Sequence, residues 1–390
     1  MKRAGLLLLM IIYITFIALG LPDALLGSAW SLIRFDLNTS LQTLGLMTIV
    51  VYIMSIFSTF NAPRLLRTFE TKWITFVSVF FTGIALIMIS QVNNFYHMLF
   101  FAIPLGLGAG AIDVSLNHYL ATHYQAKHMS YLHSFYGVGV TLGPTIMAAT
   151  LKQSNWRLGY IIVGSLLLLI AMILVVSFRL WDKESHEERQ DNHEKMSVSQ
   201  ILKYKGSSLS ILIFLIYVHM ESLAGVWISS YFFTIKNVDY ATAALFSTSF
   251  YLCLTLGRLL SGFLSHKISP IKQVHIGEAL MVFAALLMFF NFNNTVIYMI
   301  IVGIFGLGAG PIYPNMMYIN KFVFDKKSLS KIMSLQMGIG YMGFGLLTPL
   351  AGLFFGKVSI SYYPYVLSFM AILLMTLTLG FKNKVAHLAL

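Results

Sequence analysis

The 390 residues are 58% hydrophobic and only 10% charged, and their mean hydropathy of +0.79 lies far outside the range of soluble globular proteins. A formal net charge of +12 would suit a nucleic-acid partner if the basic residues shared one surface. They instead cluster at the ends of long apolar segments, so the composition indicates an integral membrane protein and excludes a nucleic-acid partner.

Twelve apolar segments are long enough to cross a bilayer as helices, because a span needs roughly 20 mostly apolar residues. Their expected ranges are 5–33, 41–63, 73–92, 96–121, 130–152, 157–179, 208–235, 240–264, 273–291, 296–320, 330–356 and 362–381. The predicted fold class is therefore an all-α membrane protein with twelve transmembrane helices. An even number of spans puts both termini on one side of the membrane. Most lysines and arginines fall on that side, which the positive-inside rule makes cytoplasmic.

The chain begins with two basic residues, Lys2 and Arg3, before its first apolar run. This run is too long for the core of a signal peptide and lacks a small-x-small cleavage site, so we expect it to be retained as a span in the plasma or inner membrane. The single cysteine, Cys253, permits no intrachain disulfide.

The first predicted span contains a helix-breaking proline at Pro22, directly before the carboxylate of Asp23. Proline frees a backbone carbonyl, which lipid cannot satisfy, so such a break is tolerated where the helix lines protein or a wet cavity. Trp30 lies seven residues after Asp23 and therefore shares its face at about 100° per residue. This face is predicted to line a cavity.

The chain contains two copies of one unit. The sequence from Gly106 to Asp113, Gly-Leu-Gly-Ala-Gly-Ala-Ile-Asp, recurs about 200 residues later as Gly-Leu-Gly-Ala-Gly-Pro-Ile-Tyr, from Gly306 to Tyr313. Further matches at nearly the same offset pair Asp23, Gly27 and Trp30 with Glu221, Gly225 and Trp227, and Gly137 and Gly139 with Gly338 and Gly340. We therefore predict a six-helix half over 1–180, a charged cytoplasmic linker over 181–206 and a second six-helix half over 207–390.

A short motif begins at Gly257 and Arg258 and continues through Gly262, in the pattern Gly-Arg-x-x-x-Gly-x-Leu followed by basic residues. It resembles the conformational cytoplasmic-loop signature of the major facilitator superfamily, between the second and third helices of a half. The corresponding stretch of the first half keeps mainly Arg67 and Lys72 and lacks the family's usual glycine and aspartate. The resemblance implies a secondary transporter whose two halves rock around a site near the bilayer midplane.

Two further patterns narrow the resemblance. They are Gly-Ala-Gly-x-x-Asp, which ends at Asp113, and His-x-x-x-Gly-x-Gly, which begins at His133. Together they resemble the fucose, galactose and glucose proton-symporter branch of the superfamily. That branch places coupling acids in its first and fourth helices, which implies this role for Asp23 and Asp113.

Three carboxylates fall well inside predicted spans: Asp23, Asp113 and Glu221. Each costs at least about 2.5 kcal/mol at mid-bilayer on insertion scales, so intramembrane acids are functional by default. We predict that all three carry protons; neutral hydrogen bonding between helices is the alternative. The resemblance places their helices among those that line the central cavity. We interpret Glu278, beside His275 near the cytoplasmic start of a span, as structural.

Several polar and aromatic residues are suited to bind a hydroxylated substrate. A hydroxyl, an amide or an imidazole can hydrogen-bond a sugar, and an indole can stack on its ring. The predicted substrate-binding residues are Asn117, Tyr313, Asn315, Trp30, Trp227, Tyr217 and His133. Anchoring at the membrane interface is the alternative for the two tryptophans, and ordinary polar packing is the alternative for His133.

The sequence contains no phosphate-binding loop, metal-ligand cluster or serine-histidine-acid arrangement above background, so we expect no cofactor, no metal and no enzymatic activity. We predict proton-coupled uptake of a monosaccharide or similar small polar solute by a monomer in the lipid bilayer. The alternatives are a proton-coupled antiporter that exports a drug or metabolite, for which 31 Phe and 21 Met would supply an adaptable pocket, and a non-transporting membrane sensor of the same fold.

Overall fold

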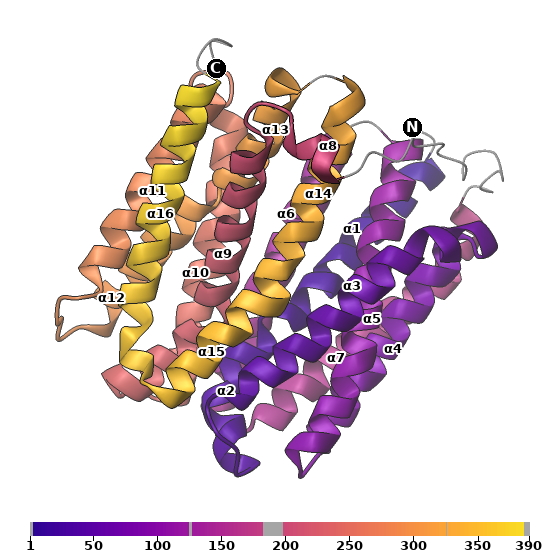
Figure 1. The fold of residues 1–390 in the computed structure, drawn as a ribbon. Coiled ribbons are helices and arrows are strands. Elements are labelled where there is room, and N and C mark those ends of the chain that lie inside the picture. The colour runs from indigo at the N-terminus through magenta and orange to yellow at the C-terminus, as the bar shows by residue number, and fades with distance from the viewer. Residues whose placement is uncertain (1–2, 125–126, 182–197, 325, 386–390) are drawn as a thin grey trace. The chain divides into compact units, whose positions relative to one another are not determined.

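The computed structural model describes residues 3–124, 127–181, 198–324 and 326–385, and the regular elements in these ranges are all helical (Figure 1). Twelve stretches in the described residues are long and apolar enough to cross a membrane, from Gly5–Asp36 to Ile360–Lys384. The predicted all-α fold class with twelve spans is confirmed.

Contacts within the chain divide it into two compact units. Unit 1 comprises Met1–His193 with Asn237–Thr248, and unit 2 comprises Glu194–Lys236 with Ser249–Leu390. The predicted linker over 181–206 falls mainly on residues 182–197, which lie outside the described residues. The half boundaries at 180 and 207 stay predictions.

Unit 1 contains the first six spans, coloured indigo to magenta in Figure 1. Its helices are α1 (Arg3–Asp23), α2 (Leu25–Asp36), α3 (Thr43–Thr68), α4 (Thr71–Ser90), α5 (Phe95–His123), α6 (Lys127–Leu151), α7 (Trp156–Ser177) and the 3₁₀ turn η1 (Phe178–Leu180). The first span is the pair α1 and α2, which is interrupted at Ala24.

Unit 2 contains the other six spans, apart from residues 240–248 at the start of α10, which belong to unit 1. Its helices are α8 (Val198–Leu202), α9 (Ser207–Lys236), α10 (Tyr240–Leu264), α11 (Pro270–Leu287), α12 (Thr295–Ala309), α13 (Ile312–Val323), α14 (Lys326–Met342), the π-helical turn η3 (Gly343–Leu347), α15 (Thr348–Lys357), the 3₁₀ turn η4 (Ile360–Tyr362) and α16 (Tyr363–Lys384). Three of its spans are composite: α12 and α13 form one, α14, η3 and α15 form another, and η4 and α16 form the last.

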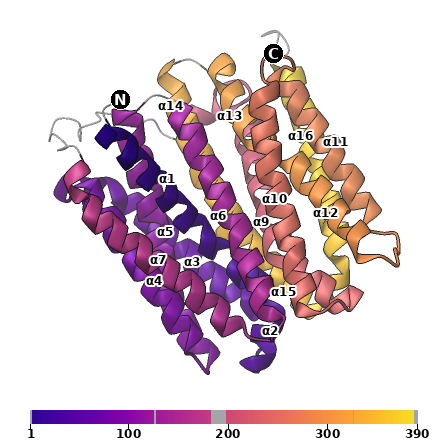
Figure 2. The same ribbon diagram turned by 180° about the vertical axis from the view of Figure 1, so that it is seen from behind.

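Corresponding helices pack in corresponding pairs in the two units. In unit 1, α1 packs on α6, α4 on α7 and α4 on α5. Their counterparts in unit 2 are α9 on α14, α11 on α16 and α11 on α12, and Figure 2 shows α11 and α16 side by side. The repeat seen in the sequence therefore reappears as a repeat of helix neighbours.

The glycines of the first repeated motif remove side chains from two faces of α5. A Cβ at Gly106 or Gly110 would overlap the backbone carbonyl oxygen of Val51 or Ser55 on α3. A Cβ at Gly108 would overlap the hydroxyl of Thr82 on α4. The motif therefore lets α5 dock closely on two neighbouring helices at once.

The second copy repeats this packing in unit 2. A Cβ at Gly306 would overlap the carbonyl oxygen of Phe250 on α10, and one at Gly310 would meet the α10 backbone at Gly257 and Arg258. A Cβ at Gly308 would overlap the carbonyl oxygen of Gly277 on α11. The same three glycine positions therefore bring together the same three helices of each repeat.

Alanine at Gly106 should therefore destabilise the protein, whereas alanine at Gly262 should not. Alanine normally favours a helix interior by about 0.8–1.0 kcal/mol over glycine, and a Cβ at Gly262 meets nothing within 4 Å. At Gly106 the overlap with the α3 backbone should outweigh that gain, because overpacking costs about 1–3 kcal/mol. Thermal unfolding in detergent should show a lower midpoint for Gly106→Ala and an unchanged or higher one for Gly262→Ala. Equal shifts for both variants would contradict this account of the packing.

Candidate functional site

The break in the first span exposes a hydrogen-bonded carboxylate. Helix α1 contains Pro22 and ends at Asp23, and α2 begins one residue beyond Ala24. The Tyr136 hydroxyl on α6 donates a hydrogen bond to Asp23 Oδ2 over 2.6 Å. The Asp23 side chain is exposed although it belongs to a membrane span. The predicted interruption is present, and it brings an acid to an accessible surface of unit 1.

A second carboxylate of unit 1 lies on α5. The Asn117 side-chain amide donates to Asp113 Oδ1 over 2.8 Å and to the Asp113 backbone carbonyl over 2.7 Å. Asp113 is half-buried, and its charge interacts with that of Asp23. We call Asp23 and Asp113 the acid pair. The two carboxylates are therefore coupled electrostatically.

One acceptor beside the acid pair has no hydrogen-bond partner in the described part of the chain. Asn117 Oδ1 is buried and accepts no hydrogen bond from any described residue. A buried amide oxygen without a partner costs about 1–3 kcal/mol, so a donor group of a bound molecule would find favourable interactions there. Tyr136, which orients Asp23, was not among the predicted site residues. The sequence could have indicated it, because Tyr136 lies three residues after the predicted site residue His133 and therefore shares its helical face.

The third predicted acid, Glu221 on α9, is ion-paired. Arg258 Nη2 on α10 lies 3.1 Å from both carboxylate oxygens of Glu221. The side chains are 21% exposed for Arg258 and 15% exposed for Glu221. The sequence analysis placed Arg258 in a cytoplasmic-loop motif and did not pair it with Glu221. In the structure, Arg258 lies within α10 and reaches sideways to α9.

Two tyrosines lie at the break between α12 and α13 in unit 2. The Tyr217 hydroxyl on α9 donates to the carbonyl oxygen of Ala309, the last residue of α12, over 3.2 Å. Tyr313 is half-buried, with its ring centroid 5.3 Å from that of Phe214 and 6.3 Å from that of Tyr217. Tyr217 therefore satisfies a carbonyl at the break, and Tyr313 lies beside it.

Asn315 belongs to a buried network that joins three helices. Its side-chain amide donates to Ser261 Oγ on α10 over 2.9 Å and to the Pro311 carbonyl over 2.8 Å. Ser261 donates in turn to Gln273 Oε1 on α11 over 2.6 Å. Both donors of this amide are used within unit 2, an arrangement that holds α10, α11 and α13 together.

The two predicted tryptophans are completely buried. Trp30 Nε1 donates to the Leu41 carbonyl over 3.1 Å. Trp227 packs against Phe355 and Gly352, and its Nε1 has no hydrogen-bond partner in the described residues. Both indoles therefore pack inside their own units.

The other predicted residues have different surroundings. His133 on α6 is exposed, and its ring lies edge-on to Phe16 at 5.9 Å. Gly257 packs against the backbone of Leu307, whereas Gly262 has open space around it. Arg67 lies in α3, and its side chain is outside the described part of the structure.

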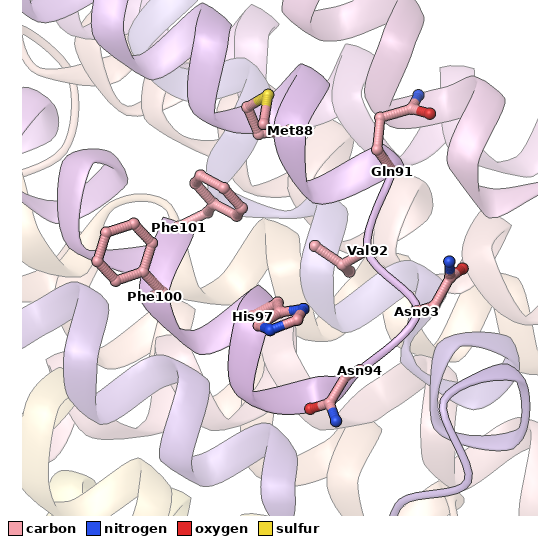
Figure 3. Close-up of a pocket in the computed structure, with 8 residues that line it drawn as sticks. All are labelled: Met88, Gln91, Val92, Asn93, Asn94, His97, Phe100 and Phe101. Atoms are coloured by element: carbon pink, nitrogen blue, oxygen red, sulfur yellow. The ribbon is translucent and has the colours of Figure 1, made fainter.

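A cavity of about 420 Å³ lies where α4 meets α5, and the sequence did not indicate it. Figure 3 shows the side chains that line it. Its lining combines apolar side chains with three amides and one imidazole. The lining residues are Met88, Gln91, Val92, Asn93, Asn94, His97, Phe100 and Phe101. Asn94 caps α5 and Asn93 accepts a hydrogen bond from Arg157, so these amides already serve the fold. None of the predicted site residues lines this cavity.

Twelve spans in two related units, with carboxylates inside the spans, define a polytopic membrane protein built from a repeat. In the described residues, no group of three or more histidine, cysteine, aspartate or glutamate side chains is placed to hold a metal ion. The chain belongs to the Major Facilitator Superfamily, whose family model matches residues 12–235 and 209–387. It is therefore a transporter of a small molecule, not an enzyme.

Curated relatives are distant. The chain is 18% identical to the Bacillus subtilis glucose/mannose transporter GlcP over 384 residues, which cover 95% of this chain and 94% of that protein. It is 22% identical to the Saccharomyces cerevisiae bypass of stop codon protein 6 over 311 residues, or 72% of this chain. The chain spans 63% of the length of the yeast protein.

Solved structures share the fold at low identity. The nucleoside transporter NupG matches with a TM-score of 0.78 and 12% identity, over 98% of this chain and all of that one. A bacterial homologue of the human lysosomal transporter Spinster, in an inward-facing, unoccupied conformation, matches with a TM-score of 0.73 and 13% identity over 98% of this chain and 96% of that one. At these identities the likeness concerns the fold.

Proposed function

We propose that this transporter couples the inward movement of protons to uptake of a monosaccharide or a similar small hydroxylated solute. The observation that carries the proposal is the acid pair: Asp23 is exposed and hydrogen-bonded, and Asp113 is half-buried and within reach of its charge. A proton gradient is the energy source that such carboxylates can use.

Protonation of Asp113, assisted by Asp23, is the proposed coupling step. A charged carboxylate must keep water or a partner, and closing the protein around it incurs a desolvation penalty. A proton removes that penalty and lets the substrate-loaded carrier change conformation. Asn117 keeps Asp113 oriented through its amide and offers its unpartnered oxygen to a substrate hydroxyl.

Unit 2 contributes mainly neutral groups to this proposal. Tyr313 presents a half-buried phenol beside Tyr217, where it can contact a sugar. Glu221 is neutralised by Arg258, so we assign it to positioning of these helices and no longer to proton transfer. The alternative of cation export needs several free acids inside the membrane, and this ion pair removes one of them.

A relative supports the substrate class. GlcP is a glucose/mannose transporter, and the alignment with it runs along nearly the whole chain. NupG, which shares the fold, is named as a nucleoside transporter, and nucleosides contain a sugar ring. We propose a cell-membrane location with cytoplasmic termini, and a monomer as the working form.

Charge movement in proteoliposomes tests the proposal. Purified protein on a solid-supported membrane is challenged with neutral hexoses, pentoses, nucleosides and lipophilic cations at equal pH on both sides. Proton symport predicts an inward positive current with one of the neutral solutes, because the only charge that moves is the proton. Cation-triggered proton release without any response to neutral solutes would replace symport by export.

A further inference from the structure

A buried acid outside the acid pair forms a separate cluster in unit 2. Glu278 on α11 is only 1% exposed. Its Oε2 lies 3.0 Å from Nδ1 of His275, one helical turn earlier, and accepts a hydrogen bond from Thr378 Oγ1 on α16 over 2.8 Å. The cluster therefore ties α11 to α16.

Within the part of the chain that the structure describes, two atoms of this cluster have no hydrogen-bond partner. Glu278 Oε1 and His275 Nε2 are both buried, and neither forms a hydrogen bond with any described residue. The carboxylate consequently has one satisfied and one unsatisfied oxygen within a membrane span. A net negative charge in this setting is costly, because neither lipid nor protein solvates it fully.

A proton relieves this cost wherever it sits on the pair. An imidazolium beside a carboxylate and a neutral imidazole beside a carboxylic acid both have zero net charge. A metal ion fits poorly, since calcium requires six to eight oxygen ligands and zinc four ligands. The described residues here offer one carboxylate, one imidazole and one hydroxyl, and no larger metal-binding group is present among them.

No other charged group in the described residues hydrogen-bonds or ion-pairs with Glu278. The ionisable residues on the helices packed against α11, and on α11 itself, are Tyr240, Tyr251, Cys253 and Arg258 on α10, Tyr298 on α12, Tyr313, Tyr318 and Lys321 on α13, Tyr363, Tyr365, Lys382 and Lys384 on α16, and Lys272 on α11. Arg258 is ion-paired with Glu221. Lys272, Lys382 and Lys384 are exposed, so their charges are largely screened by solvent.

We propose that His275 and Glu278 form a proton-binding site, distinct from Asp23 and Asp113, whose occupied form stabilises the packing of α16 on α11. The proton comes from water and is shared within the pair, so no covalent bond to a substrate is involved. Thr378 donates to the carboxyl group in this form. This inference revises the structural interpretation of Glu278 and does not rest on the identity of the transported solute.

The test compares thermal unfolding of the full chain in detergent from about pH 5 to about pH 9. A bound proton contributes stability at low pH that is lost as the pH rises through the range in which the pair releases it. Glu278→Gln removes the buried charge without changing the shape. The variant should therefore gain stability relative to the wild type as the pH rises and have the higher midpoint at alkaline pH. A constant difference between the two proteins would overturn the proposal.

Thr378→Val is the matched control, because it removes the hydrogen bond and leaves the ionisable pair. It should lower the midpoint without abolishing the pH dependence, because both ionisable groups remain. A second measurement needs only folded wild type: carbon-13 at histidine Cε1, with the signal of His275 identified by its absence in His275→Gln. That signal should shift between about pH 5 and about pH 9, because release of the proton changes the charge on the ring or on the carboxyl group 3.0 Å from it. A constant position would contradict proton binding at this pair.

Discussion

Replacing Asp113 with asparagine should abolish accumulation of substrate against its gradient while sparing exchange of substrate across the membrane. Asparagine preserves the shape of the side chain and can still hydrogen-bond Asn117, whose amide holds Asp113 now. It cannot take up a proton, so a pH gradient no longer drives the conformational cycle. In proteoliposomes, uptake under an inward proton gradient should fall to the level of equilibration, and counterflow of labelled substrate should persist.

The control for this prediction is Asp239→Asn. Asp239 lies between two spans and hydrogen-bonds Thr242 at the start of α10. Removing its charge tests whether any lost carboxylate impairs accumulation, and we expect accumulation to continue. Undiminished accumulation in Asp113→Asn would remove Asp113 from the coupling mechanism. Loss of both accumulation and counterflow would point instead to damage of the substrate site.

Removing Arg258 alone should be more damaging than removing both members of its ion pair. The pair is mostly buried in unit 2, because only 21% of the Arg258 side chain and 15% of the Glu221 side chain are exposed. Arg258→Met leaves a carboxylate without its counter-charge in a membrane span, which costs about 3–5 kcal/mol for a buried pair. We therefore expect a marked fall in the thermal midpoint and in the yield of folded protein.

The double variant, Arg258→Met with Glu221→Gln, should recover most of that stability. Replacing a buried ion pair by neutral groups of similar volume is often close to neutral, because the desolvation cost of both charges disappears with their attraction. Unfolding midpoints of the two single variants and the double variant give the coupling energy directly. Additive losses would mean that the two side chains do not depend on each other, contrary to the geometry.

The sequence predicted the fold well, since its main signals were local. Apolar segments of membrane length gave the twelve spans, and Pro22 gave the interruption near Asp23 that separates α1 from α2. The repeated glycines predicted close helix packing, and the structure identifies the neighbours, such as α3 at Gly106. Each of these signals depends on a few consecutive residues and on the bilayer thickness.

The candidate site was harder to predict, because side-chain partners on different helices depend on helix rotation and tilt. Arg258 belongs to a sequence motif that already accounted for its presence. Nothing in the sequence indicated its contact with Glu221, which is 37 residues away. Tyr136 on α6 is 113 residues from Asp23 on α1 and donates a hydrogen bond to its carboxylate. The sequence showed that acids in spans need partners, but it could not show which residues supply them.

The two repeats share the glycine motif but differ in the residue that follows it. Gly106 and Gly306 dock their helices in the same way, and seven residues later one repeat has Asp113 and the other Tyr313. Because the packing depends on backbone contacts, the side chain beyond it was free to change after duplication. After the duplication, one copy has an acidic residue and the other a tyrosine at this position, while both keep the same helical framework.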